Sequence, residues 1–422
     1  MRRIRRGCAL LLVCGLLGTA TFPRVALAQQ GTADTYLREL ARIRGVPVPA
    51  QPRIVIRSDA ETRRLLAANL ERGRPADWWE AQEKALRKFA LIPPGFRVKD
   101  AALDLLSEMI LAYFDFDRQE LVLRRQPSAP EDETTFVHEL VHLLQHSLFD
   151  AKAFLTLGPG RGDEALARRA VLEGEAQALT LDLVLARRGE DITKLPDLAM
   201  LSRMSAPPLP PRAAALPRVL REELLFPYVY GVEFVRQFRL RHPWADFSRL
   251  YRDPPRSTAQ ILHPHRYLLF RQDPRPVRLP DLSPALGDGW RLIREDDLGA
   301  LGLIIVLQAY LDELRARRLS EEWDGDRYQL YEGPNGRLAL VVFTTWRFSW
   351  KAREFASGYE ELLQKKYPTL SAVSGPATLP HRFKAGEEAV SVETRDREVL
   401  ILEGVSPDRE AALREAIWRA RP

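Results

Sequence analysis

The amino-acid sequence predicts an α+β protein of two domains, and three observations support this prediction. The chain has 422 residues, a length greater than one hydrophobic core usually supports. Its composition, 45% hydrophobic and 28% charged, is that of an ordinary globular protein. Most of residues 29–285 follow helical periodicity, whereas strands and helices alternate over residues 286–422. A proline-rich stretch at residues 274–284 separates the two patterns. We therefore expect a helix-rich domain followed by a smaller α/β domain.

Residues 1–28 have the pattern of a cleavable export signal. Arginines crowd the first six residues, an apolar run covers residues 8–17, and Ala26-Leu27-Ala28 forms a small-residue cleavage site. The apolar run is too short to cross a bilayer, so we expect no integral membrane segment after cleavage. The mature chain, beginning near Gln29, is expected to be secreted or periplasmic.

Removal of this signal would change the composition of the chain. Cys8 and Cys14 both lie within it, so the mature chain has no thiol for a disulfide or a metal. The signal also holds five arginines and no acidic residue, and its loss lowers the formal net charge from +6 to +1. The high isoelectric point of the full chain is therefore no sign of a nucleic-acid partner, and we expect none.

Hydrophobic periodicity and turn residues predict the elements of the first domain. In chain order, we expect a helix over 34–44, a strand over 52–57, one or two helices over 60–91, a helix over 103–113, and a hairpin over 113–123 with its turn at 117–119. Ser128 and Glu131 form a candidate capping box for the next helix. Proline clusters at 207–217 and 254–255 mark later loops.

The second domain alternates between helices and strands. We expect a long apolar helix over 298–318, strands near 328–332 and 338–345, a helix over 349–366, a hairpin of 389–394 with 398–402, and a last helix capped by Ser406-Pro407-Asp408. The run 301–306 is apolar enough to suggest a membrane span. Gln308 and Asp312 interrupt it within one helix length, so we expect a core helix instead.

The segment His138-Glu139-Leu140-Val141-His142 carries the clearest chemical pattern. Residues four apart share one face of a helix, so His138 and His142 can hold the same ion, and Glu139 lies beside them. Zinc suits such a pair because it binds imidazole nitrogen and keeps one position open in catalytic sites. Apolar neighbours predict a buried helix, in which two unpaired histidines would be costly. We therefore expect zinc as the cofactor and Glu139 as a general base.

Glu173 is the preferred third protein ligand, within a second strongly helical stretch. Ala170, Ala176 and Thr180 share its face, a surface of small residues that could pack closely on the motif helix. Gly174 inside a helix costs about 1 kcal/mol relative to Ala, and a close approach of two helices would explain it. The alternative is a solvated glutamate on a helix surface.

Two neighbouring polar residues compete with Glu173 for this role. Glu175 points elsewhere on the helix and is better placed to orient a ligand histidine. His146 continues the histidine stripe, but three ligands in line on one straight helix cannot surround a tetrahedral ion.

Hydrolysis of an amide also needs a donor for the developing oxyanion. His263 lies in a predicted loop, where Pro264 stiffens its backbone, and it is our first choice. Tyr228, expected at a helix start, is the second. For both residues the structural alternatives, a capping histidine or a packing aromatic, stay open.

These motifs together resemble the gluzincins, a branch of the zinc metallopeptidases. The pattern Glu173-Gly174-Glu175-Ala176 after HExxH matches the ExxA pattern that carries the third ligand in that branch. Residues 86–282 are more specifically similar to secreted bacterial proteins with a peptidase MA-like domain. The matching segments are Tyr113-Phe114-Asp115, Leu144-Gln145, Pro227-Tyr228 with Gly231, and Ile261 to Pro264. Further along the chain, Trp323 to Tyr328 also resembles that group.

The resemblance implies a zincin-like fold for residues 29–285, with a substrate backbone lying along an edge strand above the motif helix. The strand ending at Val122-Leu123 is the natural candidate for that edge. Three positions depart from the pattern of the family: Glu175 replaces Asp, and Ala259 and His265 each replace Glu. The last two affect the surroundings of His263 and leave the metal ligands unchanged.

Two functions are compatible with these residues. The first is an exported zinc metallopeptidase, a hydrolase whose partner is a peptide or protein substrate. The second is a non-catalytic exported binding or structural protein in which zinc is only a fastener. Structural zinc sites favour four protein ligands and cysteine, and the mature chain has no cysteine. We therefore expect the hydrolase.

Overall fold

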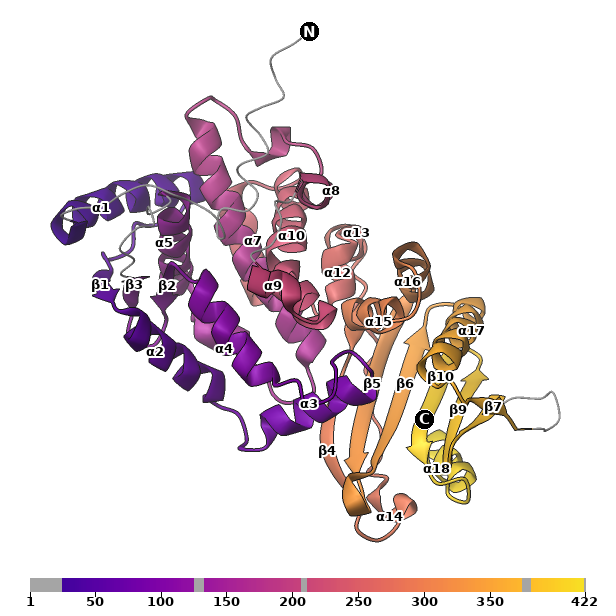
Figure 1. Ribbon diagram of the computed structural model, residues 1–422. Coiled ribbons are helices and arrows are strands. Elements are labelled where there is room, and N and C mark those ends of the chain that lie inside the picture. The colour runs from indigo at the N-terminus through magenta and orange to yellow at the C-terminus, as the bar shows by residue number, and fades with distance from the viewer. Residues whose placement is uncertain (1–24, 125–132, 206–210, 374–380, 421–422) are drawn as a thin grey trace.

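A computed structural model describes residues 25–124, 133–205, 211–373 and 381–420 of the chain (Figure 1). It confirms the predicted α+β class, with helices concentrated in the first two thirds of the chain and most strands in the last third. The predicted signal at residues 1–28 falls almost entirely outside the described residues, as do Ser128 and Glu131 of the candidate capping box. Among the described residues, no helix is both long and apolar enough to cross a membrane.

The first part of the chain begins with helices packed around a small sheet. Its elements are α1 (Val25–Arg44), β1 (Arg53–Arg57), α2 (Asp59–Glu71), α3 (Trp78–Lys88), α4 (Val98–Met109), β2 (Ala112–Asp115) and β3 (Glu120–Arg124). The predicted hairpin is present as β2 and β3. The helix expected over 103–113 instead ends at Met109, because Tyr113 and its neighbours pair with β3 as strand β2.

The strand order β1-β3-β2 corrects one prediction. The strand ending at Val122-Leu123, expected at an edge, is the central strand of this sheet. It pairs antiparallel with β2 and parallel with β1, which arrives from a distant part of the sequence. The two edges are therefore β1 and β2, and β2 is the edge that packs against the motif helix.

The rest of the first part is nearly all helical. Its elements are α5 (Glu133–Leu148), α6 (Ala151–Leu155), α7 (Gly162–Ala186), η1 (Ile192–Lys194), α8 (Leu198–Ser205), α9 (Pro211–Ala215), α10 (Arg218–Arg239), η2 (Trp244–Ser248), α11 (Arg249–Arg252), α12 (Thr258–Leu262) and α13 (His265–Leu268). The long helices α5, α7 and α10 form the middle of this part (Figure 1).

Glycines bring α7 and α10 unusually close together. A side chain at Gly174 would lie 2.4 Å from the carbonyl of Gly231, and one at Gly231 would lie 2.2 Å from Ala170 O. The close approach predicted for Gly174 is therefore real, but the partner is α10 rather than the motif helix. Gly174 follows Glu173 by one residue, about 100° around the helix, so the two residues face different neighbours.

The last part is a seven-stranded antiparallel sheet in the order β4-β5-β6-β10-β9-β8-β7. The strands are β4 (Arg291–Asp296), β5 (Trp323–Glu332), β6 (Leu338–Trp346), β7 (Ser371–Ala372), β8 (His381–Ala385), β9 (Glu388–Arg395) and β10 (Glu398–Val405). The helices are α14 (Ser283–Leu286), α15 (Gly299–Gln308), α16 (Glu313–Ser320), α17 (Ser349–Lys366) and α18 (Glu410–Arg419), with η3 (Pro334–Gly336) between β5 and β6.

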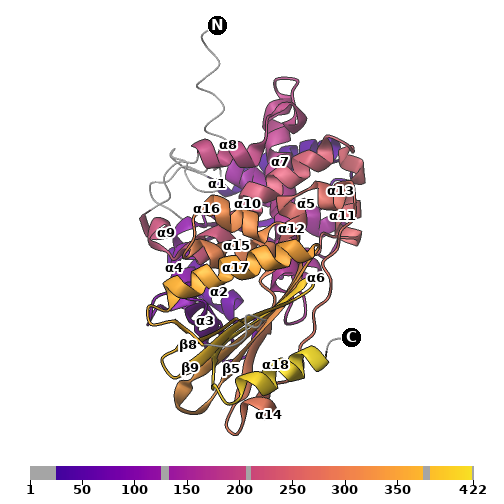
Figure 2. The ribbon, with the colours of Figure 1, turned by 90° about the vertical axis from the view of Figure 1, so that its right-hand side faces the viewer.

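Helices cover both faces of this sheet, as Figure 2 shows. Alternation along β6 explains the two layers, since Leu340 and Val342 pack with α15, α16 and α17, whereas Val341 and Phe343 pack with α14 and α18. The last helix starts at Glu410, later than the predicted cap, and its N-cap residue Arg409 makes no side-chain capping bond.

The predicted long helix over 298–318 is two helices, α15 and α16. The carboxylate of Asp312 accepts a hydrogen bond from Arg315 N and starts the second helix there. α15 is apolar on all sides because it packs against both parts of the molecule: Leu301 and Ile305 join the core of the first part, and Leu303 joins the core of the sheet.

Candidate metal centre

Two long helices bring the three predicted metal ligands together. α5 carries His138 and His142 one helical turn apart on one face, and α7 presents Glu173 to that face. The Nε2 atoms of His138 and His142 lie 3.2 and 3.4 Å from Glu173 Oε2. Among the described residues, these three form a group whose ligand atoms all lie within 4.8 Å of one another. Such a group could hold one metal ion.

The electrostatics of this group favour a positive charge at its centre. Burial alone would raise the pKa of Glu173, but the two histidines hold it well below its usual range. Burial alone would likewise lower the pKa of His142, yet Glu173 raises it to about 9. The carboxylate thus needs a nearby positive charge, which imidazolium protons or a metal cation can supply.

Glu139 lies beside the ligands and is held by strand β2. Its Oε2 atom accepts a hydrogen bond from Phe114 N at 2.8 Å. Burial raises the pKa of Glu139, and the two neighbouring histidines only partly offset this effect. A buried carboxylate with a raised pKa is a stronger proton acceptor than an ordinary glutamate, which is the property that a general base needs.

A buried hydrogen-bond network fixes the orientation of His142. His142 Nδ1 pairs with Gln145 Oε1 at 2.8 Å, and Gln145 Nε2 donates to Glu175 Oε2 at 2.9 Å. Glu175 in turn accepts from Arg44 Nε at 2.5 Å and from the Tyr251 hydroxyl. With Nδ1 as the donor, Nε2 of His142 is left free to bind a metal.

Only part of this network was predicted from the sequence. Glu175 reaches His142 through Gln145, for which no role was predicted. One signal was available: Gln145 is a polar residue in an otherwise apolar helix, three positions after His142 and therefore on nearly the same face. Arg44 lies too far away in the sequence for any local pattern to reveal it.

Tyr228 also belongs to this site. Its ring centroid lies 6.4 Å from that of His138. Burial and the carboxylates of Glu173 and Glu139 raise the pKa of its hydroxyl. Tyr228 sits well inside α10, past Pro227, and not at a helix start as predicted. Gly231 lies one turn further on, so the close contact of α10 with α7 also places Tyr228 at the metal ligands.

The remaining two histidines considered above lie apart from the ligand group. His263 ends α12, and its described neighbours are His265, Arg266 and Arg317. Burial and these cations lower the pKa of His263 to about 4. His146 pairs with Gln119 Nε2 at 3.2 Å. Among the described residues, neither of these histidines pairs with Glu173, whose histidine partners are His138 and His142.

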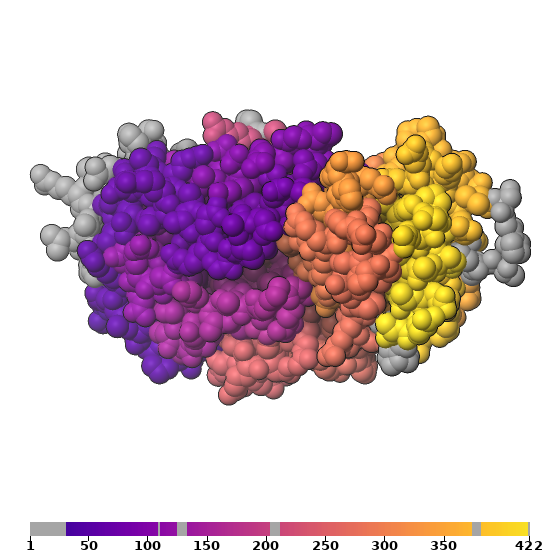
Figure 3. Space-filling view, turned by 90° about the horizontal axis from the view of Figure 1, so that it is seen from below, coloured from indigo at the N-terminus to yellow at the C-terminus, as the bar shows by residue number. Residues whose placement is uncertain are grey.

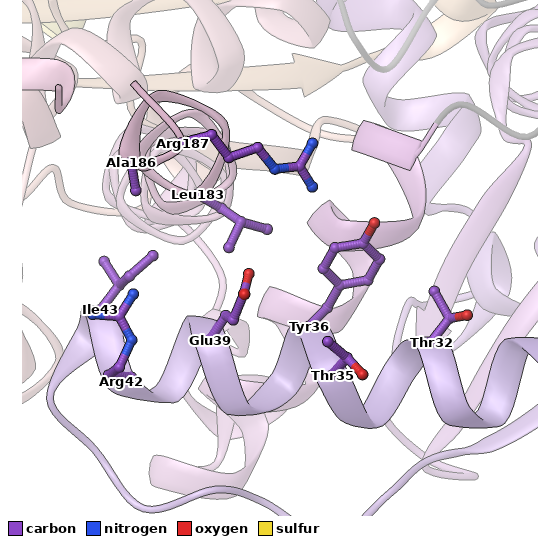
Figure 4. A pocket seen from close by; sticks show the side chains of 9 residues that line it. All are labelled: Thr32, Thr35, Tyr36, Glu39, Arg42, Ile43, Leu183, Ala186 and Arg187. Carbon is purple, nitrogen blue, oxygen red and sulfur yellow. The ribbon is translucent and has the colours of Figure 1, made fainter. Parts of the chain in front are cut away.

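A recess of about 460 Å³ lies elsewhere, between α1 and the end of α7 (Figure 4). Tyr36 and Arg187 approach one another across it, and both bond to Glu133, the first residue of α5. The Arg187 Nη2 to Glu133 Oε1 distance is 2.7 Å. These contacts tie the start of the motif helix to its neighbours, which is a structural role.

Comparisons with known sequences concern the second part of the chain. A family described as a domain of unknown function (DUF8575) matches residues 290–414, which extend from β4 into α18. A search of curated proteins and a search of solved structures each found no match. The helical part that carries the candidate metal centre thus has to be interpreted from its own residues.

Proposed function

We propose that this protein is an exported zinc metallopeptidase with a zincin-like domain, in which His138, His142 and Glu173 hold the metal and Glu139 is the general base. One observation carries the proposal: two histidines and a carboxylate from two helices converge on one point, with a second carboxylate beside them. Export, secreted or periplasmic, rests on the pattern of residues 1–28 alone.

The spacing of the ligand atoms supports zinc as the ion. Two ligands that are each about 2.0–2.2 Å from a tetrahedral ion lie about 3.3–3.6 Å apart. The Nε2 atoms of His138 and His142 are 3.2 and 3.4 Å from Glu173 Oε2, close to this separation. Two imidazoles and one carboxylate also match the ligand set of catalytic zinc, which leaves a fourth position for water or substrate.

Glu139 would move the protons of the reaction. A zinc ion held by the three ligands would supply a polarised water and a Lewis acid for the substrate carbonyl. Glu139 would take a proton from that water and pass it to the leaving amine, so that the proton taken up is returned in the same turnover. The bond from Phe114 N holds one oxygen of Glu139 in place and leaves the other for this transfer.

Tyr228 is the better placed donor for the oxyanion. Its hydroxyl belongs to a side chain next to His138 and stays protonated because its pKa is raised. His263, our first choice from the sequence, instead has His265, Arg266 and Arg317 as its described neighbours. We therefore assign this role to Tyr228 and a structural role to His263.

Strand β2 is the better candidate for the edge that binds substrate. In an antiparallel pair, every second residue directs its backbone N–H and C=O groups toward the partner strand. Leu111 is such a residue, because its carbonyl accepts a hydrogen bond from Arg124 N. The backbone groups of Ala112 and Phe114, one and three positions later, therefore point away from β3. Phe114 N indeed bonds to Glu139 on that side. A peptide in extended conformation could add to this edge beside the metal ligands.

The experiment is to compare the zinc-loaded mature protein with Glu139→Gln. Both are incubated with a diverse peptide library, and the products are read by mass spectrometry while metal content is measured in parallel. We expect one zinc per chain in both, and cleavage by the wild type only. Cleavage by Glu139→Gln at the wild-type rate would contradict the assignment. Zinc binding without cleavage by either protein would favour a non-catalytic zinc protein.

A further inference from the structure

An arginine without a partner lies one helical turn before the metal ligand Glu173. Arg169 precedes Glu173 by four residues on α7, so the two side chains share a face with their Cβ atoms about 5–6 Å apart. Arg169 is exposed, and among the described residues its guanidinium has no hydrogen-bond or ion-pair partner. Its charge partly offsets the raised pKa of the Tyr228 hydroxyl, so the guanidinium lies within electrostatic reach of that group.

Two further arginines lie near Arg169, and they come from both parts of the molecule. Arg74 precedes α3 and lies 4.7 Å from the ring centroid of Trp78, and Arg294 of β4 lies 5.0 Å from the same ring. Burial lowers the pKa of Arg74, and the charges of Arg169 and Arg294 lower it further. Arg294 is neutralised by Asp296 at 2.6 Å, whereas Arg74 has no described carboxylate partner.

An acidic residue of α10, Glu223, lies within electrostatic reach of two of these arginines. Burial raises its pKa to about 7, although the charges of Arg294 and Arg169 oppose this shift. Glu223 is nevertheless exposed, as Arg169 is, so this cluster of charged side chains is open to solvent. Figure 3 shows the surface indented where the N-terminal segments, the middle helices and the start of the second part meet.

The charge balance of this cluster is positive. Arg74 and Arg169 have no described acidic partner, and Glu223 forms no ion pair among the described residues. A guanidinium presents several donors in a plane that matches a carboxylate. Successive residues of an extended peptide advance by about 3.3 Å, so a guanidinium one helical turn from the metal ligand reaches a group within about two residues of the scissile bond.

We propose that Arg169, supported by Arg74, binds a carboxylate of the peptide substrate within about two residues of the cleaved bond. The carboxylate belongs either to an acidic side chain or to the C-terminus of the substrate. The inference deepens the proposed function and depends on zinc being bound at His138, His142 and Glu173. It makes Arg169 a specificity-determining residue and gives the second part of the chain, through Arg294, one wall of the substrate site.

The test uses binding as well as cleavage. Two pairs of peptide hydroxamates, which bind zinc through the hydroxamate group, are titrated into the zinc-loaded mature protein. One pair differs only by Glu against Gln in the side chain next to the hydroxamate, and the other by a free against an amidated C-terminus. The acidic member of a pair can form one charged hydrogen bond with Arg169 that the neutral member cannot form. We therefore expect the acidic member of one pair to bind about tenfold more tightly than its neutral counterpart. The pair that shows the preference identifies the source of the carboxylate.

Arg169→Gln should abolish this preference while the affinity for the neutral hydroxamate and the zinc content stay unchanged. Arg188→Gln is the matched control, because Arg188 is exposed just beyond the far end of α7. A preference that survives in Arg169→Gln, or no preference in the wild type, overturns the inference.

The cleavage library separates the two proposals. If the protein binds the hydroxamates but cleaves no peptide of the library, the peptidase proposal alone is refuted. The carboxylate preference of Arg169 would still be tested, because the titrations measure binding and do not need cleavage. Failure of the wild type to bind zinc would overturn both.

Discussion

Helix α7 carries two buried clusters of charged side chains that behave in opposite ways. Near its middle, Glu173 is flanked by two histidines, which hold the pKa of its carboxyl well below the usual range even though burial would raise it. Near its start, Asp163 meets Asp297 and Asp326 of the second part. Burial raises the pKa of all three, and repulsion from neighbouring carboxylates adds to this effect at Asp163 and Asp297. The pKa of a buried carboxyl on α7 is thus lowered in one cluster and raised in the other.

The partners of each carboxylate explain the difference. Asp163 accepts from Thr258 N and Oγ1, and Asp326 accepts from the backbone N–H groups of Leu298 and Gly299. These donors are fixed and satisfy the carboxylates without a cation, and Asp163 N itself donates to Asp297 Oδ1. Glu173 instead faces two imidazoles, which can either carry protons or bind a metal, and the hydroxyl of Tyr228. A metal site therefore depends on the kind of neighbouring donor and not on the number of acidic residues.

The largest expected effect separates the two clusters by metal content. His142→Ala removes one of three protein ligands, so we expect the zinc affinity to fall by more than about 100-fold. Asp297→Asn, in the other cluster, should leave zinc at one per chain. Metal analysis after dialysis against a weak chelator measures both, and equal retention of zinc by both variants would remove the distinction between the clusters.

The second prediction concerns the groups that surround the metal cluster. Tyr228→Phe removes the hydroxyl beside His138, so turnover of a cleaved peptide should fall by about 10²-fold with zinc content unchanged. His263→Ala should retain turnover within a few-fold of the wild type, although its urea midpoint is expected to fall because a half-buried side chain is lost. The reverse pattern, with turnover lost only in His263→Ala, would restore the residue first chosen from the sequence.

The smallest expected effect is a dependence of stability on pH from the acidic cluster. The pKa of Asp297 is raised to about 7 by burial and by Asp326 and Asp296, and only partly lowered by Asp163 N and Arg327. A carboxyl with a raised pKa binds its proton more tightly in the folded state, so its stabilising contribution is complete below about pH 4 and is lost as pH rises through about 7.

Between pH 5 and pH 8 we therefore expect the free energy of unfolding to fall by about 2–3 kcal/mol on account of this group. Urea unfolding curves across this range measure the effect, and Asp297→Asn should flatten them because its amide keeps an acceptor for Asp163 N but does not titrate. If the free energy of unfolding of the wild type instead rises between pH 5 and pH 8, in parallel with that of the variant, the pKa of Asp297 is not raised.

Local patterns were sufficient for the parts of the site that lie on one helix. The spacing of His138 and His142 defines a shared face whatever the rest of the fold does, and the helical stretch around Glu173 was visible for the same reason. The hairpin of β2 and β3 was likewise predictable, because its turn lies between two adjacent apolar segments.

Contacts between distant segments were beyond such patterns. The sequence indicated that Gly174 needs a close neighbour, but the identity of that neighbour depends on how α10 crosses α7. The central position of β3 depends on parallel pairing with β1, whose residues lie 67 positions earlier in the chain than their partners in β3 (Arg53 pairs with Glu120). The hydrogen bond between Arg44 and Glu175 joins residues 131 positions apart, and hydrophobic periodicity within a helix or strand cannot predict such a contact.

The most direct test of the metal cluster is a crystal structure of the zinc-loaded mature protein with anomalous data collected at the zinc edge. The account predicts one strong anomalous peak about 2.0–2.2 Å from Nε2 of His138, Nε2 of His142 and an oxygen of Glu173, and none at Asp163, Asp297 and Asp326. A zinc ion bound by His146 with Glu173 turned to solvent, or located in the acidic cluster instead, would contradict it.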